Sequence, residues 1–234
     1  MSYYFWINIL SISIPFIVSF DHRLKFYKQW KFLLPAMLGT MLIFIPWDVY
    51  KTAAGVWGFN ERYLQGVNIF NLPVEEWLFF IAIPYACLFT YHSFEYLIKQ
   101  DYLGRYAKGI TIILIIILTV VALLNPERTY TFVTFLATAL FLSLHLFVFK
   151  TNYLGRFYFT FAIILIPFFI VNGALTGSFT PEPVVWYDNT RNLGIRLGTI
   201  PIEDSVYGLL LLLMNTSIYK WLQGRTLILK NLPS

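Results

Sequence analysis

Seven long runs of apolar residues constrain what this chain can fold into. They lie at about 2–20, 32–49, 73–97, 109–124, 130–149, 157–175 and 201–222, limits set by the length of each apolar run. Each is close to the roughly 20 residues with which a helix crosses the hydrocarbon core of a bilayer. Charged residues make up only 12% of the chain and hydrophobic residues 58%, which is not the composition of a soluble domain. The sequence therefore predicts an all-α membrane protein with seven transmembrane helices.

The basic residues predict how the chain crosses the membrane. Lys51, Arg62, Arg128, Arg191 and Arg196 follow even-numbered runs, and the other basic residues lie at or after the ends of odd-numbered runs. Lysine and arginine accumulate in cytoplasmic loops. We therefore expect a multi-pass protein of the cell membrane with its N-terminus outside and its C-terminus in the cytoplasm. No basic residue precedes the first run and no small-residue cleavage site follows it, so this run is predicted to be retained as a helix.

Two of the runs begin with the same acidic pattern. Pro73-Val74-Glu75-Glu76 opens the third run, and Pro201-Ile202-Glu203-Asp204 opens the seventh. Proline is favoured at the first position of a helix, so both motifs are expected to start helices with two acids in the first turn. Gly66 and Gly194 stand at the same distance before the two prolines. The pattern predicts an internal repeat: a three-helix unit at 1–98, a linking helix at 99–129 and a second, parallel three-helix unit at 130–234.

Four acids in equivalent positions are a candidate catalytic site. An acid in a first turn commonly satisfies free backbone amides and the positive end of the helix, so a purely structural role is the alternative for each one alone. If the two helix starts face each other away from water, however, repulsion keeps all four acids from ionising together. A protonated acid beside an ionised base can add and remove protons on a substrate. Adjacent helical residues diverge by about 100°, so one acid of each pair can face a cleft while the other braces it.

The helix faces below the acids are the candidate substrate-binding surfaces. Phe79 and Phe80 follow the first pair at helical spacing, and Tyr207 and Asn215 follow the second. Aromatic faces can stabilise a developing cation. Ordinary helix packing is the alternative for each aromatic residue, and Asn172 and Asn215 are expected to hydrogen bond between helices. The long connections at about 50–72 and 176–200, rich in glycine, proline and aromatic residues, are predicted to be loops that cover this end of the protein.

Other chemistries have little support in the sequence. Cys87 is the only cysteine, so neither an internal disulfide nor a thiolate metal site can form. Carboxylates could hold Mg²⁺ for a diphosphate substrate, but several water-accessible acids spaced along one helix face are missing. No Gly-x-Gly-x-x-Gly follows a strand, so no dinucleotide site is predicted. We expect neither a metal nor an organic cofactor, and the basic loops indicate topology rather than nucleic-acid binding.

With these motifs in place, the sequence resembles the integral-membrane lycopene cyclase family, in which two small subunits, or two halves of a fused chain, each carry a Pro-x-Glu-(Glu/Asp) motif. Pro73-Val74-Glu75-Glu76 is similar to the first motif and Pro201-Ile202-Glu203-Asp204 to the second. The resemblance covers nearly the whole chain. It implies a lycopene cyclase, expected to be a β-cyclase, that closes the ends of lycopene into six-membered rings by protonation, cyclisation and deprotonation, an isomerisation without electron transfer.

The resemblance implies that Glu75, Glu76, Glu203 and Asp204 share the acid, base and cation-stabilising roles. The expected partners are lycopene or a related linear carotenoid and membrane lipid, with a homo-oligomer left open. One alternative is a cyclase of longer C50 carotenoids or one that makes a different ring isomer. Another is a seven-helix retinal-binding or proton-conducting protein, in which a Schiff-base lysine should lie in the middle of the last helix, whereas Lys220 lies near its end.

Overall fold

A computed structural model describes residues 2–230, with side chains as far as residue 224. Its long helices are α1 (Tyr3–Val18), α2 (Trp30–Ala53), α3 (Val74–Leu97), α4 (Ala107–Leu124), α5 (Thr129–Ser143), α6 (Leu154–Leu175) and α7 (Ile202–Lys230). Short helical turns are η1 (Phe26–Gln29), η2 (Glu61–Tyr63), η3 (Gly104–Tyr106) and the π-helical η4 (Leu144–Val148). Residue 1, in the predicted first repeat, and residues 231–234, the last four of the predicted second repeat, lie outside the described part of the chain.

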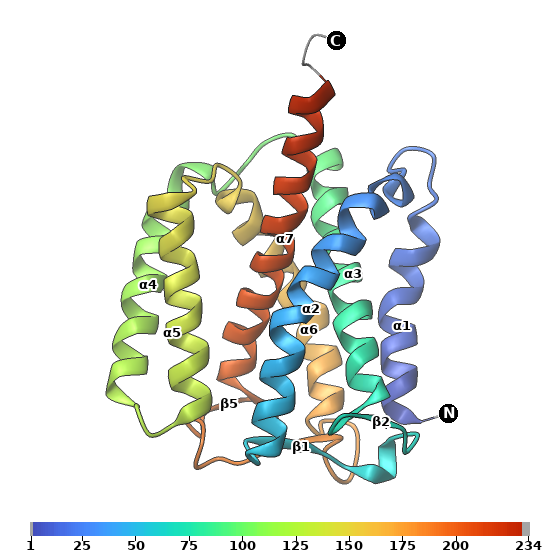
Figure 1. The fold of residues 1–234 in the computed structure, drawn as a ribbon, viewed down its shortest axis with the longest axis vertical. Coiled ribbons are helices and arrows are strands. Elements are labelled where there is room, and N and C mark those ends of the chain that lie inside the picture. Colours follow the sequence, from blue (N-terminus) through green and yellow to red (C-terminus); the bar gives the residue numbers. More distant parts are fainter. Residues whose placement is uncertain (1, 231–234) are drawn as a thin grey trace.

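Each predicted apolar run overlaps one long helix. The fifth run ends in the π-helical η4, and α7 continues past its run to Lys230. Five stretches are long and apolar enough to cross a membrane, with bounds Phe26–Ala53, Val74–Leu97, Gly104–Leu124, Thr129–Val148 and Leu154–Leu175. Helix α1 is apolar but shorter, at 16 residues. The helices form one bundle with roughly aligned axes, in which α4 and α5 pair at one side (Figure 1).

The outward-facing side chains of the bundle are apolar. Leu10 on α1 is 66% exposed, Leu42 on α2 is 78% exposed and Leu124 on α4 is 75% exposed. Soluble proteins rarely expose large contiguous apolar surface. The apolar helices and this surface together fit a membrane protein.

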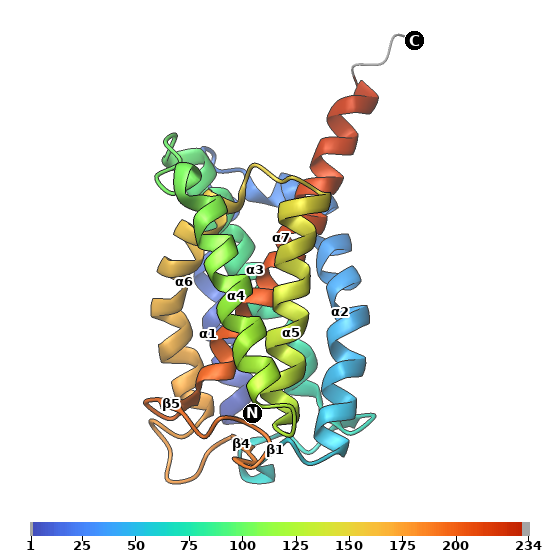
Figure 2. The same ribbon diagram turned by 90° about the vertical axis from the view of Figure 1, so that its left-hand side faces the viewer.

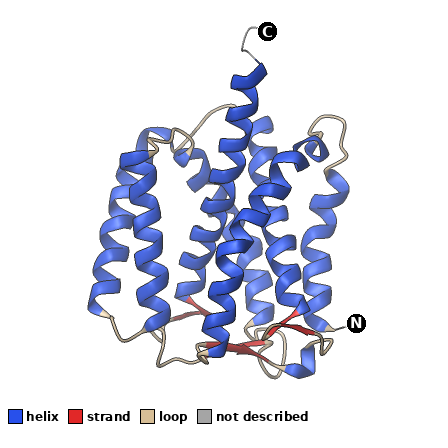
Figure 3. Ribbon diagram, viewed as in Figure 1, coloured by secondary structure: helices blue, strands red, loops and turns tan. Residues whose placement is uncertain are grey.

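The two ends of the bundle differ. All the short strands gather at the end where the N-terminus lies, the lower end in Figure 3. The C-terminal end of α7 projects from the opposite end (Figure 2). The loops at 50–72 and 176–200 therefore lie together, and both cover the helix starts that carry the acidic motifs.

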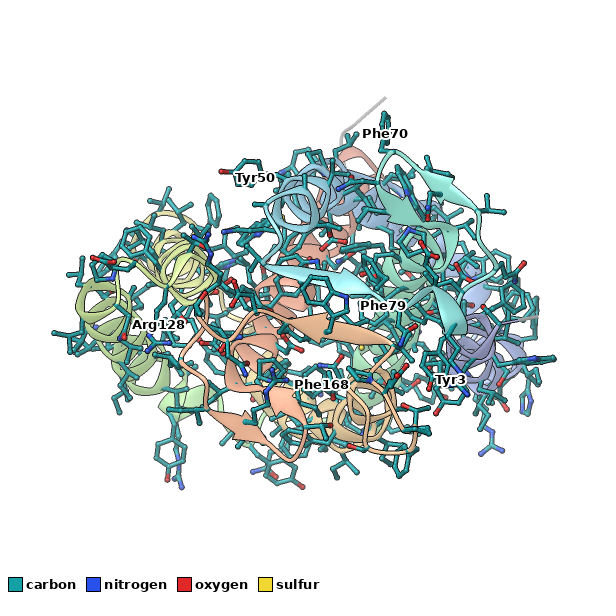
Figure 4. The ribbon with its side chains drawn as sticks, turned by 90° about the horizontal axis from the view of Figure 1, so that it is seen from below. Tyr3, Tyr50, Phe70, Phe79, Arg128 and Phe168 are labelled. Atoms are coloured by element: carbon teal, nitrogen blue, oxygen red, sulfur yellow. The ribbon has the colours of Figure 1, made fainter. Side chains whose placement is uncertain are left out.

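The two long loops are joined by a strand pair that the sequence did not predict. Strand β1 (Trp57–Phe59) pairs antiparallel with β4 (Val185–Tyr187), with Gly58 opposite Trp186. The two strands cross the lower end of the bundle side by side (Figure 4). As predicted, neither connection contains a further long helix. Both contain short strands as well as turns.

Each acidic helix is entered through a small hairpin. Strand β2 (Asn68–Ile69) pairs with β3 (Leu72–Pro73), and β5 (Arg196–Leu197) pairs with β6 (Ile200–Pro201). Gly66 and Gly194 precede the hairpins with φ angles of 81° and 72°, a left-handed conformation that glycine adopts without strain. The prediction that the prolines occupy the first helical position is wrong. Both pair as strand residues, and Pro73 is the extended N-cap of α3, because the hairpin runs directly into the helix.

Candidate active site

A cavity of about 390 Å³ lies inside the bundle between α1, α3, α6 and α7. Residues Glu76 to Thr90 line it along α3, a length of about 21 Å at 1.5 Å per residue. Strands β1 and β4 close its lower end with Trp57, Phe59, Val185 and Tyr187. Most of the lining is apolar, and the polar side chains concentrate near the strands. The titratable ones there are Tyr4, Asp48, Glu76, Tyr130, Tyr187, Asp204 and Tyr207.

All four motif acids are buried, but only one of each pair lines the cavity. Glu75 and Glu203 are fully buried, Asp204 is 5% exposed and Glu76 is 9% exposed. Glu76 and Asp204 line the cavity, whereas Glu75 and Glu203 are not among its lining residues. The second acid of each motif therefore faces the space where a substrate could lie. This is the division within each pair that the 100° step of a helix allows.

The first acid of each motif holds its own hairpin in place. Glu75 Oε1 accepts hydrogen bonds from Ser2 Oγ at 2.5 Å and from the Gln65 backbone amide at 2.7 Å. Glu203 Oε1 accepts from Thr131 Oγ1 at 2.6 Å and from the Leu193 amide at 2.8 Å. In both cases the amide lies ten residues before the acid, and the hydroxyl comes from a neighbouring helix end. These two acids fasten equivalent loops to equivalent helix starts.

The second acids accept hydrogen bonds from the walls of the cavity. Tyr4 donates to Glu76 Oε2 at 2.6 Å. Tyr130 donates to Asp204 Oδ1 at 2.6 Å, and Asp204 Oδ2 accepts from Asn172 Nδ2 at 2.8 Å and from Tyr187 at 2.9 Å. The expected interhelical role of Asn172 is confirmed by its bond from α6 to α7. Asp204 is thus held by three donors, and Glu76 by one.

Asp48 is a third carboxyl of the cavity, and sequence reasoning missed it. It lies near the end of α2, is 3% exposed, and lines the cavity with Glu76 and Asp204. Its Oδ2 has no hydrogen-bond partner among the described residues. In the sequence it stands between Trp47 and Lys51 at the end of an apolar run, which is typical of an ordinary membrane-interface residue. Only its burial distinguishes it.

The hydroxyl of Tyr187 interacts electrostatically with all three acids. Burial raises the pKa of Tyr187 well above its usual value, and the carboxyls of Asp204, Glu76 and Asp48 raise this pKa further. Tyr187 lies on β4, in the loop that covers the site, so the strand pair delivers a hydrogen-bond donor to the acids. Its hydroxyl stays protonated at neutral pH and can donate to Asp204.

Two of the four predicted substrate-binding residues line the cavity. Phe79 and Tyr207 do, and Tyr207 packs edge-on against Trp57 with ring centroids 6.5 Å apart. Figure 4 places Phe79 and Phe168 near the middle of the bundle, with Tyr50 and Phe70 at its edge.

Phe80 and Asn215 are placed elsewhere. Phe80 is 1% exposed and packs in the core against Phe44. It follows Phe79 directly on α3, and a step of about 100° around the helix turns its side chain away from the cavity. Asn215 is fully buried and donates to the Leu211 carbonyl of its own helix at 2.9 Å. The prediction that Asn215 hydrogen bonds between helices is therefore wrong. Neither residue lines the cavity.

The cavity reaches the side of the bundle between α1 and α6. Leu10 and Ile14 line it from α1 although they are 66% and 69% exposed, and Pro167 lines it from α6 and is also exposed. These residues belong to the apolar outer surface of the bundle. The opening therefore faces the region that lipid would occupy.

The lining determines which chemistry the site can perform. No lysine, arginine or histidine is among the described residues that line the cavity. No group of three or more potential metal-binding residues occurs in the described part of the chain. What the cavity offers is carboxyls, phenol hydroxyls and aromatic rings around an apolar space, a set suited to proton transfer on a hydrocarbon.

Comparison with known families gives one match. A family model described as lycopene cyclase matches residues 1–94 and 127–222, which together make up most of the 234 residues. A search of curated proteins and a search of solved structures found no match.

Proposed function

Because the chain belongs to the lycopene cyclase family, we propose that it is a lycopene β-cyclase, an isomerase that closes the linear ends of lycopene into six-membered rings. The observation that carries this proposal is the position of Glu76 and Asp204, one from each motif, in a single buried and largely apolar cavity. A hydrocarbon substrate has no polar group to bind. The site instead supplies protons and negative charge to a chain held by apolar contacts.

The charges of the cavity favour a mixture of protonated and ionised acids. Asp48, Glu76 and Asp204 face one space, and none of the described residues that line it is a cation. Two unit charges about 4 Å apart repel by roughly 4 kcal/mol at an effective dielectric constant of 20. Ionising all three acids is therefore unfavourable, so at least one keeps its proton. The three donors around Asp204 stabilise its ionised form most.

The reaction follows from this pairing of acid and carboxylate. A cavity carboxyl adds its proton to the terminal double bond of the substrate and leaves a tertiary carbocation. The neighbouring double bond attacks this cation and closes the six-membered ring. Asp204 stabilises the positive charge and removes a ring proton, which forms the ring double bond. One C–H bond forms and another breaks, so the product has the mass of the substrate and no electron acceptor is needed.

The substrate is expected to bind by one end. The cavity is about 21 Å long along α3, shorter than an extended C40 polyene, so the end group lies beside the acids and the remainder passes out between Leu10 and Pro167. Phe79 and Tyr207 then lie beside the reacting end group, where aromatic faces can stabilise the cation. A second ring requires the molecule to leave and re-enter by its other end. Released monocyclic product is a consequence of this geometry.

The same proposal includes the membrane arrangement. All seven helices cross the bilayer, with the acidic motifs and the N-terminus at the outer side of the cell membrane. The units at 1–98 and 130–234 are parallel repeats joined by the helix within 99–129. The equivalent hairpins before α3 and α7, and the equivalent bonds to Glu75 and Glu203, support this repeat.

The function is tested by producing the protein in cells that accumulate lycopene and separating their pigments by chromatography. We expect monocyclic and bicyclic β-ring products with the mass of lycopene. The double variant Glu76→Gln/Asp204→Asn, present in the membrane at the same level, should leave lycopene unchanged. Unchanged lycopene in cells that hold ample wild-type protein would contradict the proposal. Rings of another isomer, or conversion only of C50 carotenoids, would favour the alternative cyclases.

The retinal-binding alternative has less support from the site. Lys220 on α7 forms an ion pair with Glu95 on α3 and does not line the cavity. A Schiff base needs a lysine beside the ligand. Adding retinal to the purified protein should therefore give no shifted visible absorption band.

A further inference from the structure

Asp48 is the cavity acid whose role the two motifs do not explain. It belongs to α2, outside both motifs, and is 3% exposed. Tyrosine hydroxyls donate to Glu76 and to Asp204, but Asp48 Oδ2 has no hydrogen-bond partner among the described residues. A buried carboxylate oxygen without a donor is strongly disfavoured in an apolar setting. A neutral carboxyl costs less there, because it carries no net charge.

Among the described residues, no cation lines the cavity beside Asp48 to hold it as an anion. Lys51 follows one turn later on α2, but its Nζ donates to the Thr129 carbonyl at 3.0 Å and does not line the cavity. Glu76 faces the same space from α3, and Tyr207 faces it from α7 with a hydroxyl that has no partner among the described residues. The nearest charges that share the cavity are therefore other acids.

The three acids differ in how many donors they accept from. Asp204 accepts three hydrogen bonds, Glu76 accepts one from Tyr4, and Asp48 accepts one from Trp57 but has no donor to its Oδ2 among the described residues. Hydrogen bonds to a carboxylate stabilise its ionised form, so the proton resides preferentially where donors are fewest. Asp204 is therefore the best-stabilised base, and Asp48, which has one oxygen buried without a donor, keeps its proton more readily than Glu76.

We propose that Asp48 is the proton donor of the cyclisation, an inference that rests on the proposed function. The O–H bond of its carboxyl breaks as a C–H bond forms at the terminal double bond of the substrate, and the cation appears at the adjacent carbon. After ring closure Asp204 takes up the ring proton, and proton transfer by way of Glu76, which lines the same cavity, restores the starting state. The substrate gains one proton and loses one, so its composition and its number of electrons do not change.

The test compares Asp48→Asn with wild type in the lycopene assay, at matched protein amounts and with melting temperature measured in detergent. The amide has the same shape and cannot donate an acidic proton, so cyclic products of every ring type should fall at least 100-fold, within the range of about 10²–10⁴ expected for a general acid. Glu61→Gln removes an exposed carboxyl at the same end and should leave the rate unchanged. Asp48→Glu keeps the acid on a longer arm and should retain measurable ring formation.

The outcomes are separable. Ring formation by Asp48→Asn within threefold of wild type, or an altered mixture of ring isomers at undiminished total rate, would overturn the donor role while the proposed function stands. Complete loss of activity in a folded Asp48→Glu protein would also overturn it, because an acid remains in place. If wild type itself forms no rings, both the proposed function and the donor role fall.

Discussion

Single amide variants of adjacent motif acids separate the cavity-facing acid from its neighbour. Glu76→Gln and Glu75→Gln each replace one oxygen by nitrogen, one helical position apart, in two buried side chains. Glu76 lines the cavity, so the Glu76→Gln substitution removes a charge or a proton from beside the substrate. A carboxylate about 4 Å from a cation contributes roughly 4 kcal/mol at an effective dielectric constant of 20. At about 1.4 kcal/mol for each tenfold change, the rate should fall by roughly 10³.

Glu75→Gln is expected to behave differently. The amide oxygen of glutamine can still accept from Ser2 Oγ and the Gln65 amide, the two bonds that Glu75 Oε1 makes. What is lost is the charge-assisted part of two bonds, about 1 kcal/mol each. The thermal stability of the protein should drop measurably, while the rate per folded molecule should fall by less than about tenfold.

The assay is conversion of lycopene by purified protein in detergent or lipid, with pigments quantified by chromatography and folded protein by its melting curve. Asp204→Asn and Glu203→Gln provide the same contrast in the second repeat. Equal losses of rate in Glu75→Gln and Glu76→Gln, at equal folded amounts, would refute the division of roles within each pair.

Two further variants test the substrate path and the packing of the bundle. Leu10→Trp narrows the opening between α1 and α6 and should slow conversion of lycopene about tenfold. Leu42→Trp, on an exposed face outside the cavity, is the control and should not slow it. Equal rates for the two variants would argue against this path. Gly155→Ala places a Cβ 2.5 Å from the backbone of Gly104 and should destabilise the protein by about 1–3 kcal/mol, measured as a lower melting temperature. Gly109→Ala meets no atom within 4 Å and is its control, so similar melting temperatures for both would contradict the close contact.

The helices could be predicted from the sequence because lipid leaves few choices. An apolar run such as 109–124 must satisfy its backbone internally, and a helix is the one way for a single segment to do so. The paired acids were equally visible, because Glu75 and Glu203 interrupt apolar sequence at equivalent positions. The register of these patterns fixes where helices begin, but leaves open how each helix is rotated about its axis.

Helix rotation explains most of what the sequence could not show. Phe79 and Phe80 are neighbours, yet only Phe79 lines the cavity, and the choice depends on packing against α2 and α7. From the sequence alone, Asp48 looks like a residue at the membrane interface, and only the structure shows that it is buried. The β1–β4 pair joins residues more than 120 positions apart through strands of three residues, too short to leave a periodic pattern.

We propose that Glu76, Asp204 and their neighbours cyclise a hydrocarbon by moving protons alone. The most direct measurement is a single-turnover reaction in D₂O, with protein equilibrated in D₂O and present in excess over lycopene, followed by mass spectrometry of the products. We expect one deuterium for each ring formed, delivered by a carboxyl that had exchanged with solvent. Rings formed without deuterium would show that hydrogen shifts within the substrate, and would contradict a carboxyl donor in this cavity.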